Sequence, residues 1–136
     1  MDNEKHKTEW YVLQNQFDSY EKHSLYIKLA AILVVFLAGI LASISSFIAV
    51  ILIVLWLQDA IWKTFQSRLE TRLLKIEYAI SSGAEGDVLQ FNSGYQRERL
   101  NGLLLISEYA RQSIRPTVAF PYVVLILIVL LQAVFF

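Results

Sequence analysis

Asp59 is the residue in this sequence best suited to take part in chemistry, and its carboxylate follows a run of apolar and aromatic side chains. An ionisable residue in a membrane span is a functional candidate, because burying a charge there is costly. Lys28 falls at a matching depth if the chain folds back as two antiparallel helices. The pair could belong to a proton or ion pathway, or form an ion pair that anchors the helices at the membrane boundary. We favour the ion pair, because the apolar segments offer only Gln132 and three serines as further polar groups.

The remaining polar residues form no pattern typical of catalysis or cofactor binding. The chain has no cysteine, which excludes disulfides, thiolate chemistry and cysteine-based metal sites. His6 and His23 lack a carboxylate cluster at ligand spacing, so no metal site is expected. No nucleophile elbow, phosphate-binding loop or zinc-helix motif occurs. Twelve basic residues balance twelve acidic ones, which argues against a nucleic-acid-binding protein. We therefore expect no enzyme activity, no catalytic residue and no cofactor.

Three apolar blocks dominate the sequence and predict an all-α membrane protein. They are Leu29–Ser45, Phe47–Leu57 and Val118–Phe136. A membrane-spanning helix needs about 20 mostly apolar residues. The second block reaches span length only by continuing through Asp59 to Trp62. The expected transmembrane helices are 26–45, 47–62 and 118–136.

The positive charges predict the orientation of these spans. All 12 lysines and arginines lie either before the first block or between the second and third blocks, and none lies in the Ser43–Ser46 hairpin. Loops rich in lysine and arginine stay in the cytoplasm. The N-terminus is therefore expected in the cytoplasm, and the C-terminus on the far side of the membrane.

Two polar segments carry apolar stripes at helical spacing. The first stripe is Trp10, Leu13, Phe17 and Tyr20, and the second is Phe65, Leu69, Leu73, Ile76 and Ile80. Spacings of three and four place each stripe on one helix face. When the two helices are paired as an antiparallel hairpin, both stripes fall into register. We therefore predict that 8–25 and 63–81 form an antiparallel cytoplasmic stalk continuous with the first two spans, which offers a surface for a protein partner.

One alternative places the N-terminal helix flat on the membrane surface. Its polar face is not rich in lysine or arginine, and the net charge of the 28 residues before the first apolar block is −1, which favours the stalk. After the stalk, we expect a loop over 82–94 and a third cytoplasmic helix over 95–115. Arg115-Pro116 would end that helix, because the residue before proline disfavours the α conformation.

Small residues on the first span form a candidate helix-association face, which comprises Ala38, Gly39, Ala42, Ser43 and Ser46. Gly39 and Ser43 are four residues apart, a spacing that lets helix backbones approach closely. This face could pack against the second span or associate with another copy of the chain, and the sequence does not choose between them. The expected partners are the lipid bilayer and, through such faces, further copies of the chain.

The segment 55–62, Leu-Trp-Leu-Gln-Asp-Ala-Ile-Trp, precedes a helix that carries Arg68, Glu70, Arg72 and Leu73. In these residues the chain resembles small bacterial three-span membrane proteins whose second span ends in an aromatic-x-x-Asp-Ala box. Their organisation is similar to that of SLATT-type membrane effectors, although Gln58 stands here where leucine is usual. The resemblance implies an inner-membrane effector that assembles and perturbs the membrane in bacterial antiphage defence.

Two functions from different classes follow. The first is an oligomeric effector of the bacterial inner membrane that perturbs or permeabilises it. The second is a non-conducting interaction protein, such as an anchor, an assembly factor or an immunity protein. A transporter ranks last, because three spans without an internal repeat make a poor translocation path.

Overall fold

The computed structural model describes residues 2–41, 45–83, 91–98 and 101–135. The described chain is all-helical, with α1 (Asp2–Ile40), α2 (Ser46–Ser82), α3 (Phe91–Glu98), α4 (Leu103–Ser113) and α5 (Pro116–Phe135). Helices α1, α2 and α5 are each long and apolar enough to cross a membrane. The structure thus confirms that the described chain is all-helical and has three helices long and apolar enough to span a membrane, as predicted.

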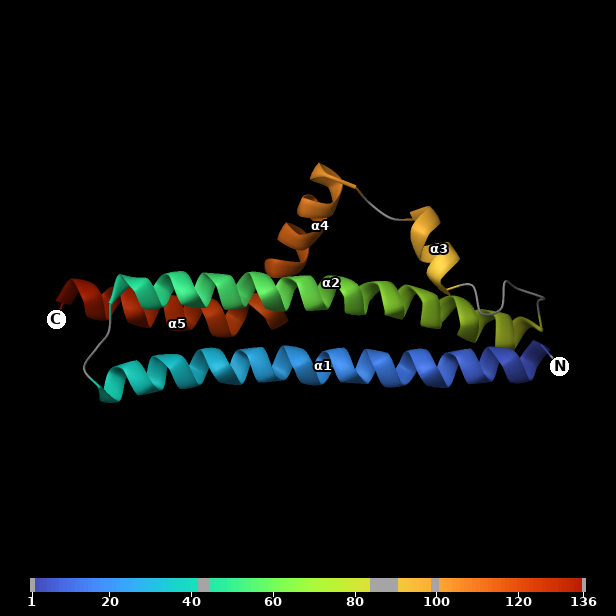
Figure 1. Cartoon of the computed structure of the whole chain (residues 1–136), viewed down its shortest axis with the longest axis horizontal. Coiled ribbons are helices and arrows are strands. Elements are labelled where there is room, and N and C mark those ends of the chain that lie inside the picture. Colours follow the sequence, from blue (N-terminus) through green and yellow to red (C-terminus); the bar gives the residue numbers. More distant parts are fainter. Residues whose placement is uncertain (1, 42–44, 84–90, 99–100, 136) are drawn as a thin grey trace.

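Helices α1 and α2 form a long antiparallel pair, with α5 beside the end of the pair where α1 turns into α2 (Figure 1). α1 has 39 residues, which corresponds to about 58 Å at ~1.5 Å per residue. A bilayer core of ~30 Å covers only half of that length. We call residues 2–23 of α1 and 63–82 of α2 the stalk, and residues 24–40 of α1 and 46–62 of α2 together with α5 the apolar half.

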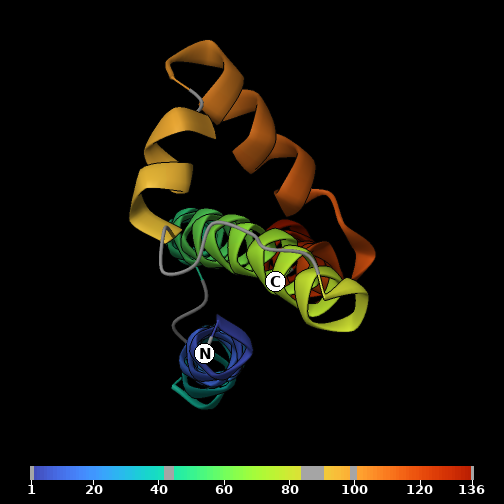
Figure 2. The same ribbon diagram turned by 90° about the vertical axis from the view of Figure 1, so that its right-hand side faces the viewer.

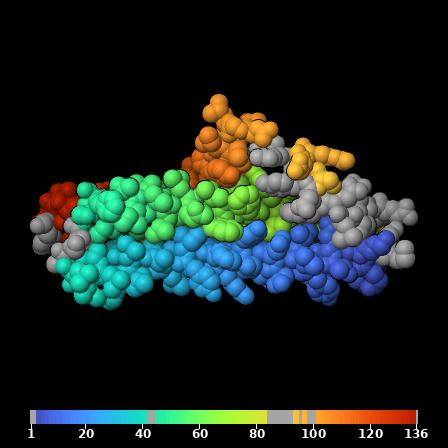
Figure 3. Space-filling model, in the orientation of Figure 1, coloured from blue at the N-terminus to red at the C-terminus, as the bar shows by residue number. Residues whose placement is uncertain are grey.

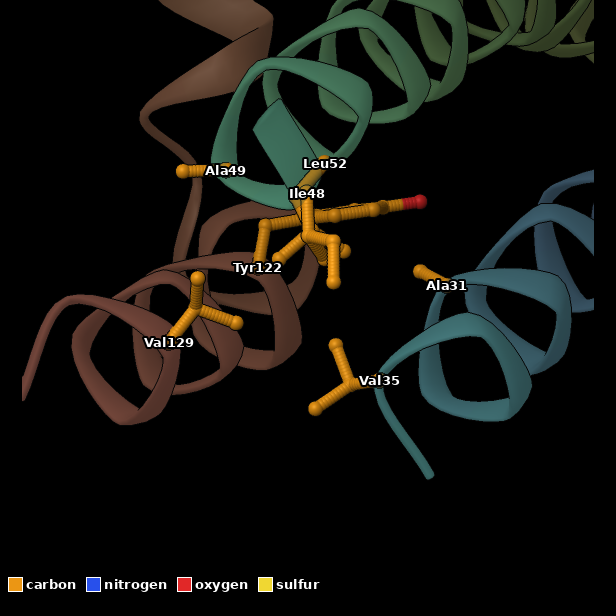
Figure 4. Packing of buried hydrophobic residues seen from close by; sticks show 7 residues of the cluster. All are labelled: Ala31, Val35, Ile48, Ala49, Leu52, Tyr122 and Val129. Carbon is orange, nitrogen blue, oxygen red and sulfur yellow. The ribbon is translucent and has the colours of Figure 1, made fainter. Parts of the chain in front are cut away.

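The apolar half is a three-helix bundle. Its buried side chains point into the space between the helices (Figure 4), and they are Ala31, Val35, Ile48, Ala49, Leu52, Tyr122 and Val129. Large apolar side chains cover the outside of the same helices, for example Phe36, Val54 and Leu127. An apolar exterior around an apolar core is what a bilayer selects, because no face has to meet water.

The stalk has its own core between α1 and α2. Leu13, Leu69, Leu73 and Ile76 are buried there, and Trp10, Phe17, Tyr20 and Ile80 pack against them. These eight residues come from the two stripes that the sequence analysis singled out, and α1 and α2 are in contact over the part of the pair that is visible in Figure 3. Phe65, the ninth stripe residue, lies outside this cluster, and the Arg68 guanidinium stands over its ring at 5.7 Å.

Four predicted boundaries differ from the structure. The single helix predicted over 95–115 is wrong, because α3 and α4 are separate helices. Gly102 adopts φ 58° between them, a left-handed backbone that glycine accepts without steric cost and that breaks a right-handed helix. The predicted loop over 82–94 is too long, because α3 begins at Phe91, while 84–90 lie outside the described residues.

The third span begins with Pro116 rather than at 118, which suits a proline because the first helical residue needs no intrahelical N–H bond. A second proline, Pro121, lies inside α5, five residues after its start. The N-terminal helix also begins earlier than expected, at Asp2, and is continuous past Ser24 as far as Ile40.

Candidate functional site

A buried polar cluster joins the three helices of the apolar half around Asp59. The Asp59 side chain is 0% exposed. Ser24 Oγ donates a hydrogen bond to Asp59 Oδ1 at 2.5 Å, and Tyr122 Oη donates one to Oδ2 at 3.3 Å. Lys28 Nζ lies 3.6 Å from the same Oδ2. We call these four residues the Asp59 cluster.

Each helix contributes to this cluster through simple helical geometry. Ser24 and Lys28 are four residues apart on α1, so they occupy the same face one turn from each other. α2 supplies Asp59 at the end of its apolar run, and α5 supplies Tyr122 near its start. A buried carboxylate is costly unless paired, and here two hydroxyl donors and an ammonium group offset that cost.

The position of Tyr122 is set by Trp56. The two rings stack with 6.3 Å between centroids and an interplanar angle of 11°. Trp56 also donates its indole N–H to the backbone carbonyl of Ser113 at 3.0 Å, where α4 ends. The tryptophan therefore holds the start of α5 and the end of α4 against α2.

The cluster is closed rather than poised for reaction. Both Asp59 oxygens accept hydrogen bonds, and the Lys28 ammonium lies beside Oδ2. Among the described residues, every buried side-chain nitrogen or oxygen has a hydrogen-bond partner. The arrangement can clamp three helices together, but it presents no free base, no nucleophile and no open coordination position.

The sequence analysis paired Lys28 with Asp59, and the structure brings these two side chains together. It missed Ser24 and Tyr122. The position of Ser24, one helical turn before Lys28, was a weak indication that it belongs to the cluster. Tyr122 was easier to identify, because a tyrosine hydroxyl within an apolar helix needs a hydrogen-bond partner.

An ion pair and a hydrogen bond join α1 and α2 in the stalk, in addition to the apolar core. Arg72 donates from Nε and Nη2 to Glu9 Oε1 at 2.9 and 2.7 Å, and the Glu9 side chain is only 5% exposed. Trp10 Nε1 donates to Glu77 Oε1 at 2.9 Å. These bonds fix the axial register between α1 and α2, because each joins one residue on each helix.

A second group of polar contacts lies where the stalk meets the apolar half. Lys63 Nζ donates to Glu21 Oε2 at 2.6 Å, and Gln66 Nε2 donates to the same oxygen at 2.7 Å. These two hydrogen bonds lower the pKa of the Glu21 carboxyl below its ordinary value. Nearby, Arg68 of α2 pairs with Glu108 of α4 at 2.9 Å.

The residues of the predicted helix-association face have different environments in the structure. Ala38 packs against the core of the apolar half. Gly39 is exposed, and a Cβ atom added there would meet nothing within 4 Å. Ser46 is also exposed, whereas Ala42 and Ser43 lie outside the described residues. Packing within the chain therefore accounts for Ala38 but leaves the surface around Gly39 open.

Within the described residues, no three histidine or carboxylate side chains gather as metal ligands do. His6 is buried in the stalk. His23 stacks on Trp62 at 5.2 Å, with Nδ1 2.6 Å from the Ser19 carbonyl oxygen. Both histidines thus lie in the α1–α2 pair, 17 residues apart on one helix.

The chain matches no protein-family model, and no curated protein or solved structure shows significant similarity to it. Its function must therefore be inferred from contacts within the chain.

Proposed function

We propose that this chain is a non-conducting interaction protein of the bacterial inner membrane. In this proposal α1, α2 and α5 cross the bilayer and hold the stalk in the cytoplasm, where it presents a rigid surface to a protein partner. The distribution of charge supports this orientation, because all 12 lysines and arginines fall before the first apolar block or between the second and third. The chain would then be an anchor, an assembly factor or an immunity protein.

The observation that carries the proposal is the closed Asp59 cluster. An ion pathway needs polar groups that can exchange partners along the depth of the membrane. Here the buried carboxylate is engaged by Ser24, Lys28 and Tyr122 of the same chain. Beyond this cluster, the helices of the apolar half are lined by apolar side chains in their shared core.

The experiment is a membrane-potential measurement with a voltage-sensitive dye, in bacteria that express the chain. The control is a well-tolerated three-span protein at matched membrane level. We expect the potential to equal that of the control. Depolarisation beyond the control would overturn the non-conducting proposal.

One observation favours the second candidate, an oligomeric effector that perturbs the membrane in antiphage defence. The open surface at Gly39 is suited to close approach by another helix. Most of each candidate span also remains uncovered, since only 17%, 33% and 17% of the three apolar windows is buried. These surfaces leave room for further copies of the chain.

The effector candidate is tested by the replacement Gly39→Leu, with Leu33→Ala as a control on the exposed surface of the same helix. Native mass spectrometry in lipid nanodiscs counts the subunits. If the chain assembles through Gly39, the larger side chain should reduce the subunit number without altering the fold. An unchanged subunit number in the variant, or a monomeric wild type, would remove this interface.

A further inference from the structure

Helix α4 carries apolar side chains that the rest of the described chain leaves uncovered. Leu103 is 84% exposed and Ile106 is 61% exposed. Ile114, directly after the helix, is 72% exposed. Several exposed apolar side chains on one short helix are typical of a surface that meets lipid or another protein.

The place of α4 in the fold indicates what that environment is. Its last residue, Ser113, is held at Trp56, and α5 begins three residues later with Pro116. α4 runs steeply across the long axis of the molecule at the level where α5 begins (Figure 1). It lies on the side of α2 away from α1 (Figure 2). If the three long helices cross a bilayer, α4 therefore runs along its surface.

The ion pair with α2 determines which face of α4 looks toward the bilayer. Glu108 of α4 binds Arg68, which lies in the stalk part of α2. Trp56, which holds the end of α4, lies in the apolar half of the same helix. The Glu108 side of α4 therefore faces the stalk. With ~3.6 residues per turn, Leu103 and Ile106 lie roughly 140° and 160° away from Glu108 around the helix. These two side chains are thus directed toward the apolar half.

The charges of α4 follow the opposite pattern. Arg111 is exposed and lies roughly 60° from Glu108 around the helix, on the stalk-facing side. Arg115 is also exposed, at the junction with α5. An amphipathic helix with an apolar face toward the acyl chains and arginines at the level of the phosphates is typical of a membrane interface.

We propose that α4 is an interfacial helix, whose face made of Leu103, Ile106 and Ile114 enters the boundary of the bilayer on the stalk side. The occupant of this face is lipid, because α4 is continuous with a candidate span and its apolar side is turned toward that span. The proposal rests on the membrane location given above. Through the Arg68–Glu108 pair, α4 couples the stalk to the membrane surface.

Depth measurement by spin labelling tests the proposal, and the absence of native cysteine makes single labels simple to place. Ile106→Cys reports on the proposed lipid face, and Leu103→Cys is a second site on that face. Leu104→Cys is the matched control, because Leu104 is 65% exposed but lies about 40° from Glu108, on the stalk-facing side. The full chain is reconstituted in vesicles of phosphatidylethanolamine and anionic phosphatidylglycerol at about 3:1.

Collisions of each label with oxygen, which concentrates in lipid, are compared with collisions with a water-soluble nickel chelate. We expect labels at Ile106 and Leu103 to favour oxygen at least threefold more strongly than the label at Leu104. Val124→Cys on the exposed side of α5 is the bilayer control, and Thr71→Cys on the stalk is the water control.

The controls separate two failures. If the Val124 label collides with nickel as often as the Thr71 label does, α5 is outside the bilayer and the membrane location fails together with this inference. If Val124 is in lipid while Ile106 and Leu103 are as accessible to nickel as Leu104, the interfacial helix alone is overturned. The face of α4 would then be left for a protein partner.

Discussion

The two ends of the α1–α2 pair are held together by different forces. In the stalk, an apolar core of leucine and isoleucine is flanked by ion pairs, as between Glu9 and Arg72. In the apolar half, the Asp59 cluster lies within apolar packing. The proposed membrane location accounts for the difference. In that location water drives apolar side chains together in the stalk, whereas the lipid around the other half is as apolar as the core it surrounds.

The comparison shows that one pair of helices can change its mode of association along its length. Polar contacts should dominate where the surroundings are apolar, and apolar contacts where they are aqueous. Single substitutions in the two regions can break or sharpen this contrast, and they are ordered here from the largest expected effect to the smallest.

The largest effect is expected from Asp59→Leu. The change leaves the Lys28 ammonium and the hydroxyls of Ser24 and Tyr122 without their shared acceptor, and removing one partner of a buried ion pair costs about 3–5 kcal/mol. Unfolding of the purified chain in mixed micelles, followed by circular dichroism, measures the loss. Gln58→Leu at the neighbouring exposed position is the control and should stay within about 0.5 kcal/mol. Equal losses in both variants would contradict the clamp.

In the stalk, Leu73→Ala should destabilise the chain by about 3 kcal/mol, because it removes a buried side chain and leaves a cavity. Leu74→Ala, one residue further and 59% exposed, is its control. Leu52→Ala is the equivalent change in the apolar half and should cost less, because only packing is lost where lipid surrounds the bundle. A larger loss at Leu52 than at Leu73 would reverse the proposed contrast.

Glu9→Gln should cost about 2 kcal/mol, since hydrogen bonds to charged groups contribute ~1.5–3 kcal/mol and Arg72 loses its charged acceptor. Glu4→Gln is the matched control on the same helix. Glu4 pairs with Lys7 at 3.2 Å, but its side chain is 79% exposed, so the change should be nearly neutral. The same denaturation measurement applies, and a Glu9 variant as stable as the Glu4 variant would show that the buried pair does not hold the stalk.

The smallest effect concerns the pH dependence of the Glu21 contact. The folded-state pKa of Glu21 is lowered by hydrogen bonds from Lys63 and Gln66. Its contribution to stability is therefore fully present above the ordinary carboxyl pKa and is lost as the pH falls through the lowered folded value. The Glu21 side chain is 60% exposed, so this contribution should stay below about 1 kcal/mol.

Comparison of wild type with Glu21→Gln between pH 7 and pH 3 tests that dependence. The wild type should be slightly more stable at neutral pH, and the difference should shrink as the solution is acidified. A difference that stays constant over this range would show that the Glu21 charge does not contribute.

Much of the fold was readable from the sequence, because helix formation and solvent preference are local properties. The three apolar blocks predicted the candidate spans, and the spacing of Trp10, Leu13 and Phe17 predicted which face of α1 would pack. The connection before Ser46 is short, so it restricts the axial register of the antiparallel helices α1 and α2. The pairing of the two stripes and the proximity of Lys28 to Asp59 follow from that register.

The remaining features required the tertiary structure, because they depend on how separate helices are rotated and placed. Tyr122 is 63 residues from Asp59, and nothing in the local pattern fixes the rotation that directs its hydroxyl to that carboxylate. The open surface at Gly39 and the direction of α4 are also relations between elements. Periodicity assigns each residue to a face of its own helix, whereas packing decides what that face meets.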